Sequence, residues 1–258
     1  MSVRTDIDDR PGGRIAWVVI DRPARANALD SAGLDALASA FETLAADGAL
    51  RVAVLASVGK RAFSGGADVA EMRDLGPETA EAFIRRIHRV CTSIRDLPVP
   101  VVARIQGACL GGAMEIAAAC DLRIASTAAS FAMPEVRIGI PSVVEAALLP
   151  RLIGWGAAAD LVLTGEPIDG ETAQRLGFVQ RLAPPERLDG ALARAVDAIL
   201  LAGPHAIRLQ KRLMREWESL PLDAAIGRGI DCFVESWRGD EPRRMMTDAL
   251  AGRAAKGG

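Results

Sequence analysis

The sequence predicts an α/β fold, on three observations. The segment Arg14–Asp21 is a mostly apolar run, which is typical of a strand buried on both faces of a sheet. Apolar side chains between Leu34 and Leu44 recur at helical spacing, and the run Arg51–Ala56 predicts a second strand. A strand, a helix and another strand in this order form the basic unit of an α/β protein. With 258 residues, 50% of them hydrophobic, the chain can bury a sizeable core.

The later elements follow from the same kinds of pattern. Prolines at positions 98 and 100 end one helical pattern and begin a strand. Strands are expected over residues 99–105, 121–126 and 129–133. Helices are expected within 71–97, at 116–120, within 168–182 where Gly177 ends the helix before a short strand, and over 188–201, 204–217, 222–237 and 245–250.

Composition argues against several classes of function. The net charge of −2 gives no electrostatic case for a nucleic-acid partner. No apolar stretch reaches the length of about 18 residues that a membrane span needs, and the polar opening MSVRTDIDDRPGGR does not resemble a signal peptide. We therefore expect a cytoplasmic protein that binds neither membranes nor nucleic acid.

Cysteine and histidine usage argues against a metal site. The chain has four cysteines without a CxxC pair, and only two histidines, so no metal-ligand spacing is present. Buried free thiols in a reducing compartment are expected instead. A GxSxG elbow is absent, and the glycines from Gly107 to Gly112 are followed by alanine where a phosphate-binding loop needs lysine, which excludes serine-hydrolase and Walker-type readings.

The stretch from Val101 to Gly139 carries the candidate chemistry. Its centre is Gly111-Gly112, followed by Glu115 in a segment with almost no other polar side chain, and Glu135 lies twenty residues further on. A helix that opens at paired glycines presents free N–H groups to an anion, and a buried carboxyl is either costly or useful. Each feature taken alone has an ordinary explanation, because paired glycines often form a turn and a helical glutamate is usually solvated.

An upstream stretch has a second glycine pair. Gly65 and Gly66 precede Ala67 and Asp68 in the sequence RAFSGGADVAEM. One N–H group from each glycine stretch could converge on a single carbonyl oxygen and form an oxyanion hole.

At this point the chain resembles the enoyl-CoA hydratase/isomerase (crotonase) superfamily. The resemblance rests on four stretches in the family's order and spacing, within residues 15–185: FSGGADVAEM, IQGACLGGAMEIAAACDLRIAS, FAMPEVRIGIP and LTGEPIDGETAQRLGFVQRL. It implies a crotonase-like spiral of repeated ββα units over residues 1–195, with the coenzyme A and active sites. Residues 196–258 would then form a C-terminal helical region that packs a homotrimer, often doubled to a hexamer.

The resemblance also implies a reaction. The N–H groups of Ala67 and Gly112 would stabilise the thioester oxygen, Glu115 would activate water as the base, and Glu135 would protonate the α-carbon. The implied function is an enoyl-CoA hydratase of fatty acid metabolism that needs no cofactor, since the acyl-CoA thioester is the substrate. An enoyl-CoA isomerase, another crotonase-type reaction and a non-catalytic coenzyme A-binding scaffold remain alternatives, although retaining two carboxyls in an apolar pocket favours the hydratase.

Substrate contacts are implied at further positions. The family places coenzyme A contacts in the loop that contains Arg22 and Arg25, where this chain has Ala24 in place of a frequent basic residue. Both arginines could equally be solvated loop charges. Residues 74–80, with the sequence DLGPETA, are expected to wall the acyl pocket. The full set of expected substrate-binding residues is Arg22, Arg25, Ala26, Gly65, Gly66, Asp68, Gly111, Pro134 and Ser142.

The chain departs from the family after Pro141. Many members have a glycine-rich PGxGG turn there, whereas this chain has the sequence Pro141-Ser142-Val143-Val144-Glu145. Ser142 and Glu145 fit a capping box, which makes Glu145 a stabilising residue of a helix start. The alternative is that Glu145 is a third carboxylate at the pocket edge. His88 lies at the edge of a helical pattern and is expected to be structural.

Overall fold

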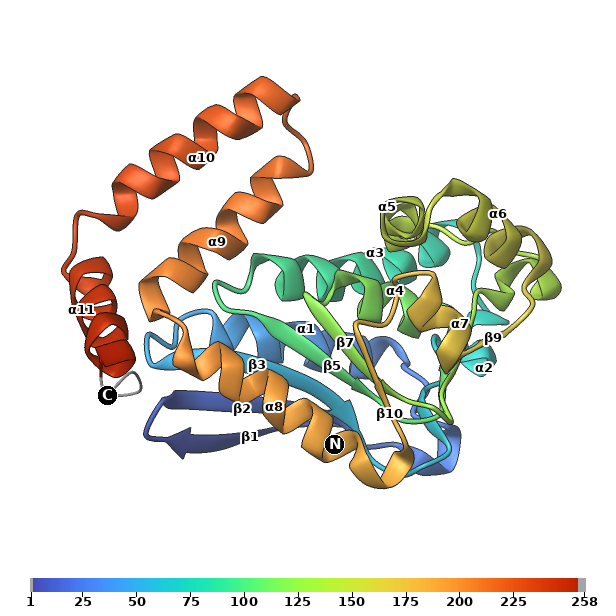
Figure 1. Ribbon diagram of the computed structural model, residues 1–258. Coiled ribbons are helices and arrows are strands. Elements are labelled where there is room, and N and C mark those ends of the chain that lie inside the picture. Colours follow the sequence, from blue (N-terminus) through green and yellow to red (C-terminus); the bar gives the residue numbers. More distant parts are fainter. Residues whose placement is uncertain (1, 255–258) are drawn as a thin grey trace.

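Two β-sheets and the helices between them form the body of the protein, from which a helical arm extends (Figure 1). The structure is a computed structural model and describes residues 2–254. The strands are β1 Val3–Arg10, β2 Gly13–Ile20, β3 Leu50–Ser57, β4 Ala62–Ser64, β5 Val101–Ile105, β6 Ala108–Leu110, β7 Leu122–Ser126, β8 Ser130–Ala132, β9 Ile168–Asp169 and β10 Arg181–Ala183.

Helices and strands are interspersed along the chain up to β10, and only helices follow β10. The α-helices are α1 Ser31–Leu44, α2 Val69–Met72, α3 Pro77–Asp96, α4 Gly112–Ala119, α5 Leu149–Ile153, α6 Trp155–Thr164, α7 Gly170–Arg175, α8 Leu188–Leu201, α9 Pro204–Trp217, α10 Leu222–Ser236 and α11 Glu241–Ala254. The 3₁₀ helices are η1 Pro23–Arg25, η2 Pro134–Ile138, η3 Val144–Leu148 and η4 Pro185–Arg187.

From β3 to β8 successive strands alternate between the two sheets, which gives the spiral of ββα units that the resemblance implies. The larger sheet has the order β1-β2-β3-β5-β7-β10, and the smaller has the order β4-β6-β8-β9. From β2 to β10 the larger sheet is parallel, with β1 added antiparallel at its edge. Each pass of the chain therefore leaves the larger sheet, adds a short strand to the smaller one and returns through a helix. The α/β fold predicted from the sequence is confirmed.

Helix α4 lies in the middle of this arrangement and is buried along its whole length. Its sequence, GAMEIAAA, has mostly small side chains, which lets neighbouring backbone approach closely on all sides. Helices α1 and α3 pack against each other beside it and contribute Phe41 and Ile94 to the main core. Helix α8 covers the opposite face of the larger sheet with a second apolar cluster that includes Leu188 and Val196.

The element bounds agree with the sequence patterns most closely in the C-terminal half. Helices α8 and α9 have the predicted bounds, and α7 is capped by Asp169, which accepts a hydrogen bond from the amide of Thr172. The helix expected within residues 71–97 is α3 and begins only at Pro77, because Pro at the first helical position and Gly76 before it mark the start. The short strands β4 and β6 were not predicted, since runs of three residues carry no periodic signal.

Strand β1 was also missed in the sequence, because five of its eight residues, VRTDIDDR, are charged. It lies at the sheet edge, where Arg4 pairs with Asp6 and Arg10 pairs with Asp8. Charged side chains on an edge strand oppose pairing with another sheet, so a strongly polar strand is stable in this position.

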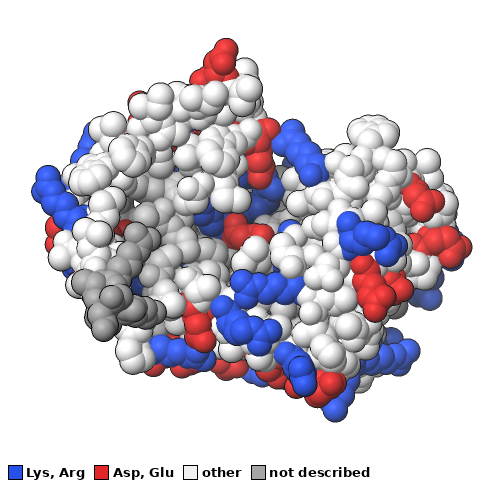
Figure 2. Space-filling model, in the orientation of Figure 1, with Lys and Arg blue, Asp and Glu red and all other residues white. Residues whose placement is uncertain are grey.

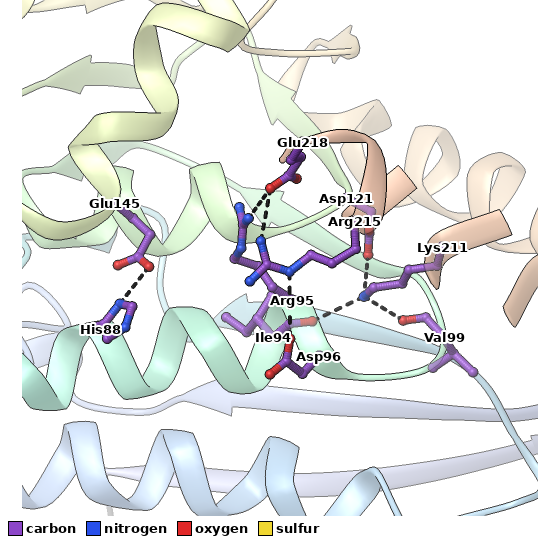
Figure 3. A network of polar contacts seen from close by, with 10 residues as sticks. All are labelled: His88, Ile94, Arg95, Asp96, Val99, Asp121, Glu145, Lys211, Arg215 and Glu218. Carbon is purple, nitrogen blue, oxygen red and sulfur yellow. Dashed lines mark hydrogen bonds and ion pairs between the residues drawn. The ribbon is translucent and has the colours of Figure 1, made fainter. Parts of the chain in front are cut away.

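Helices α9, α10 and α11 form an arm that extends from the body (Figure 1). Lys211 anchors α9, because its ammonium group donates to the carbonyls of Ile94 and Val99, at 3.1 and 2.9 Å, and to Asp121 at 2.8 Å (Figure 3). By contrast, α10 packs mainly on α9, and its outer surface is largely uncharged (Figure 2). Its exposed large apolar side chains are Leu222, Ile226, Ile230, Phe233 and Val234.

The four cysteines, Cys91, Cys109, Cys120 and Cys232, are buried free thiols. Burial raises the pKa of Cys120 to about 12. Within residues 2–254, no single helix has the length and apolar character of a membrane span, although the bent pair Pro185–Leu201 and Pro204–Trp217 passes that criterion when taken together.

Candidate active site

The two glycine pairs predicted to converge do so. Gly66, with φ of +87°, lies so close to the second pair that a Cβ atom on it would be 2.5 Å from the carbonyl oxygen of Leu110 and 3.3 Å from the amide nitrogen of Gly112. A Cβ atom on Gly112 would in turn be 3.8 Å from the amide nitrogen of Ala67. Only glycine fits at Gly66, because both its backbone conformation and the close approach exclude a side chain.

Backbone pairing holds the first glycine stretch in place. The amide of Leu29 donates to the carbonyl of Gly66 at 2.8 Å, and the amide of Asp68 donates to the carbonyl of Leu29 at 2.9 Å. This bridge uses the groups on either side of Ala67 and leaves the amide of Ala67 itself without an acceptor in the described chain. Gly112 is the first residue of α4, and its amide likewise donates no hydrogen bond to any described residue. Two backbone donors are therefore available side by side.

Glu115 lies one turn into α4 and is 3% exposed. Its Oε1 accepts the amide of Ala146 at 3.2 Å. Burial is the main cause that raises the pKa of Glu115 to about 8, with further increases from the charges of Glu135 and Glu145 and an opposing effect from the Ala146 amide. Glu115 therefore retains its proton at a pH at which an ordinary carboxyl is fully ionised.

Glu135 approaches the same point from η2. A Cβ atom on Gly111, which has φ of +54°, would be 2.6 Å from Oε1 of Glu135, so the second glycine pair also makes room for this carboxyl. The hydroxyl of Ser142 donates to Oε2 of Glu135 at 2.9 Å. Burial raises the pKa of Glu135, and the Ser142 hydroxyl opposes that rise.

Both carboxyls and both free amides border one cavity of about 420 Å³. Its remaining walls are mainly apolar, and two of them, Leu75 and Ala80, come from the stretch 74–80 that was expected to form a pocket wall. The cavity is lined by Ala67, Met72, Leu75, Ala80, Glu81, Phe83, Ile84, Ile87, Gly112, Glu115, Glu135, Ile140, Pro141 and Val143. It thus combines an apolar chamber with two backbone donors, the buried carboxyl of Glu115 and the half-buried carboxyl of Glu135, which is the usual make-up of a small-molecule site.

The loop with Arg22 supports the first glycine stretch. Arg22 donates to the carboxylate of Asp68 at 2.8 Å and to the carbonyl of Ala28 at 3.1 Å. Burial raises the pKa of Asp68, but hydrogen bonds from Arg22 and from a backbone amide outweigh it and keep the pKa below its ordinary value. Arg22 and Asp68, both expected to bind substrate, are therefore paired with each other, whereas Arg25 is exposed.

Other expected substrate-binding positions belong to the same framework. The carbonyl of Ala26, a residue with φ of +52°, accepts the amide of Gly65 at 2.8 Å. Pro134 opens η2 directly before Glu135. These residues fix the positions of the first glycine stretch and of Glu135. Ser142 contacts Glu135 directly.

The capping box predicted at Ser142 and Glu145 is wrong. No side chain caps the start of η3, because Ser142 donates to Glu135 and Glu145 turns instead toward helix α3. There Oε1 of Glu145 lies 2.8 Å from Nδ1 of His88 (Figure 3). Long-range partners outcompete the local pattern here. Glu145 is 8% exposed, and its Oε2 has no hydrogen-bond partner among the described residues.

Two participants of the site were not predicted from the sequence, namely the amide of Ala146 and the imidazole of His88. A backbone amide carries no residue-type signal, and a lone helical histidine is not distinctive. The signal that could have pointed to them is the departure from the glycine-rich turn at residues 142–145, since replacing glycines by Val144 and Glu145 requires new contacts.

The fold, together with the two glycine pairs that border one apolar cavity, defines a protein of the crotonase-like class. Its backbone superposes with the crystal structure of an enoyl-CoA hydratase from Bacillus anthracis at a TM-score of 0.91, with 27% identity over 98% of this chain and 97% of the other. For an enoyl-CoA hydratase from Mycobacterium smegmatis the TM-score is 0.88, with 31% identity over 92% and 91% of the two chains.

Sequence comparison gives the family. The family model described as Enoyl-CoA hydratase/isomerase matches residues 11–248. The chain is 30% identical to a short-chain-enoyl-CoA hydratase from Clostridium acetobutylicum, over 95% of this chain and 94% of the relative. It is 32% identical to a crotonyl-CoA hydratase from Syntrophomonas wolfei, over 94% of both. The chain therefore belongs to the enoyl-CoA hydratase/isomerase family.

Proposed function

We propose that the protein is an enoyl-CoA hydratase, a lyase that adds water across the α,β double bond of an enoyl-CoA thioester. The observation that carries this proposal is the presence of Glu115 and Glu135 beside the free amides of Ala67 and Gly112 at one cavity. The hydratases among the relatives, with about 30% identity over nearly the whole chain, support it.

The two amides form the oxyanion hole in this proposal. As water attacks the β-carbon, the thioester oxygen gains enolate charge, and two fixed N–H donors stabilise it without reorganisation of solvent. Loss of one such donor costs about 3–4 kcal/mol of transition-state energy in comparable sites. The apolar walls strengthen the effect because charge is less screened in a dry cavity.

The two carboxyls exchange protons with water and substrate. The water oxygen bonds to the β-carbon, one carboxylate takes the proton that this oxygen loses, and the other carboxyl gives its proton to the α-carbon. The pair must therefore hold one proton between them at the start of the reaction. Burial raises the pKa of both carboxyls, that of Glu115 to about 8. For Glu115 to act as the base and Glu135 as the acid, the shared proton has to be on Glu135 when the substrate is bound.

The second candidate is an enoyl-CoA isomerase, which the family name also includes. Moving a double bond needs a single carboxyl that carries one proton from one carbon to another. The pairing of Ser142 with Glu135 favours the hydratase, because this hydroxyl maintains a second ionisable carboxyl in a largely apolar cavity. A non-catalytic coenzyme A-binding scaffold would have no use for either carboxyl.

The proposal also covers the cofactor requirement, the oligomeric state and the cellular location of the enzyme. The reaction needs no cofactor, because both protons and the oxyanion donors come from the chain and from water. The exposed apolar side chains of α10 support assembly into a homotrimer or hexamer, since a large exposed apolar surface is normally covered by a partner. We place the enzyme in the cytoplasm and in fatty acid metabolism, with Arg25 free to meet coenzyme A.

The test is hydration of crotonyl-CoA, followed as loss of the absorbance of the conjugated thioester. Wild-type protein should turn over, and Glu115→Gln and Glu135→Gln should each lower kcat by about 10²–10⁴-fold, since glutamine keeps the shape but exchanges no proton. Incubation with the 3-enoyl isomer separates the candidates. An isomerase would convert it to the conjugated thioester without forming a hydroxyacyl product, which would refute hydratase function.

A further inference from the structure

The segment Ile140–Ala146 connects the reacting carboxyls to a histidine on another helix. Within this segment the Ser142 hydroxyl donates to Glu135 at 2.9 Å, and the Ala146 amide donates to Glu115 at 3.2 Å. Between these two contacts Glu145 meets His88 at 2.8 Å. Three consecutive attachments therefore fix one short stretch, and two of them touch the groups that exchange protons.

The backbone between these attachments is strained. Val144 has φ of +39°, a conformation that a β-branched residue rarely adopts. Such a residue keeps this geometry only where surrounding contacts enforce it. Val144 starts η3, and the contacts closest to it in sequence are those made by Glu145 and Ala146.

The Glu145–His88 contact is able to hold Val144 in its strained backbone conformation. The contact joins Glu145 to His88 on α3 (Figure 3). The Glu145 side chain is 9% exposed and close enough to Glu115 to affect its pKa, whereas the His88 side chain is 56% exposed. A buried carboxylate with one oxygen unpartnered is costly unless the other oxygen is held well. His88 is hydrogen-bonded to that other oxygen, and the Cys91 thiol also lies beside the Glu145 carboxyl.

The charged and titratable groups around this pair come from three elements. Glu115 lies on α4, which packs against η3, and Cys91 lies one turn beyond His88 on α3 and close enough to both glutamates to be affected by their charges. On the outer side of α3, His88 shares a surface hollow with Glu42, Arg85, Arg89 and Asp96. Arg89 is engaged with Glu42 there, at 2.7 Å.

We propose that His88 is a positioning residue of the active site, which acts by holding Glu145. This contact keeps the strained segment Ile140–Ala146 in one conformation. In that conformation the Ser142 hydroxyl reaches Glu135 and the Ala146 amide reaches Glu115. The inference rests on the proposed function, because it takes Glu115 and Glu135 as the reacting groups. It assigns to an exposed residue on α3 an effect on chemistry that takes place inside the cavity.

The experiment compares His88→Ala with three other variants in the full-length protein. His88→Asn keeps an N–H group where the imidazole has Nδ1, Arg89→Ala removes an ion pair from the neighbouring position of α3, and Val144→Gly in the His88→Ala background removes the strain. Two quantities are measured for each, namely kcat and KM for crotonyl-CoA, and hydrogen exchange of the backbone amides over residues 140–148.

We expect His88→Ala to lower kcat at least tenfold with KM within about threefold of wild type, and to speed exchange over residues 140–148. His88→Asn and Arg89→Ala should stay within threefold of the wild-type kcat, and Val144→Gly should restore part of the activity that His88→Ala loses. Unchanged kcat and unchanged exchange in His88→Ala would overturn the inference, as would an equal loss in Arg89→Ala. A wild-type protein inactive toward crotonyl-CoA would refute the proposed function alone, since the exchange measurement still decides what His88 holds.

Discussion

Ser142 donates its hydroxyl to the carboxyl group of Glu135 across a distance of 2.9 Å, from a segment that has no regular α-helix or strand. This contact makes the ionisation of a candidate acid depend on a loop residue. It also gives Ser142 a contact within the protein, in addition to the substrate contact expected of this residue.

Ser142→Ala should raise the pKa of Glu135 further, because it removes a hydrogen bond that favours the ionised form. The acid limb of the kcat/KM profile, where the second proton joins the carboxyl pair, should move to higher pH. Ser142→Thr keeps the hydroxyl and is the matched control, with an unmoved limb. If KM rises instead and neither limb moves, Ser142 contacts the substrate and not Glu135.

The pH dependence of the wild-type enzyme should be bell-shaped. The proposed mechanism needs one proton on the carboxyl pair, so the alkaline limb reports the loss of that proton and should fall at about pH 8, the raised pKa of Glu115. Glu145→Gln removes a nearby negative charge that raises this pKa, and should therefore move the alkaline limb to lower pH. A limb that stays in place in Glu145→Gln would show that the two charges are not coupled.

Glu115→Gln should make the protein more stable at alkaline pH while it lowers activity. The folded-state pKa of Glu115, about 8, lies above the ordinary value of 4.5, so the group's contribution to stability is largest below pH 4.5 and is lost as pH rises toward 8. Glutamine does not titrate and therefore avoids this loss. In wild type the loss lowers the free energy of unfolding by at most about 5 kcal/mol. The difference in Tm between variant and wild type should therefore grow from pH 5 to about pH 8.5. A constant difference would contradict the raised pKa.

Gly112→Pro should leave the fold largely intact and lower kcat by about 10²–10³-fold. Proline is tolerated at the first position of a helix, where the N–H group has no helical acceptor, but it removes the donor proposed to hold the oxyanion. Ala67→Ser keeps the other backbone donor and should be mild. Circular dichroism confirms folding before the rates are compared, and a folded Gly112→Pro protein with wild-type kcat would exclude this amide from the mechanism.

Ile230→Glu should disrupt assembly. Ile230 is 63% exposed on α10, which also exposes Ile226, Phe233 and Val234, and a charge buried against a partner without a counter-charge is strongly unfavourable. Analytical ultracentrifugation should find wild type as a multiple of the 27.2 kDa chain and the variant as smaller species. Asp223→Asn, on the same helix, is the control and should assemble normally. A wild-type monomer would refute the proposed trimer.

The sequence was most informative where a pattern depends on local physics or on an uncommon residue combination. The two glycine pairs, one before Ala67 and the other before Glu115, predicted two free backbone donors and a buried carboxyl. The structure brings these groups to one cavity. The capped α7 and the amphipathic α8 and α9 were also predictable, because caps and helical spacing act within a few residues.

The parts that could not be predicted depend on partners distant in sequence. Strand β1 has the composition of a loop and is stable only because β2 supplies its partner. At Glu145, a capping interaction worth about 1 kcal/mol competes with burial against α3, and the sequence contains no measure of that burial. His88 could not be placed at the site for the same reason, since it lies 57 positions from Glu145.

Gly66 approaches Leu110 so closely that no side chain fits between them, and this has an evolutionary consequence. The two amides beside that contact belong to the main chain, so point mutations outside the two glycine pairs, other than Ala67→Pro, leave the donors themselves in place. A descendant gene could therefore lose or relocate Glu135, or exchange Ser142 and Glu145, while it keeps the proposed oxyanion hole. Such a scaffold would diversify by substitutions in the 3₁₀ segments around the cavity, while the two glycine pairs are inherited unchanged.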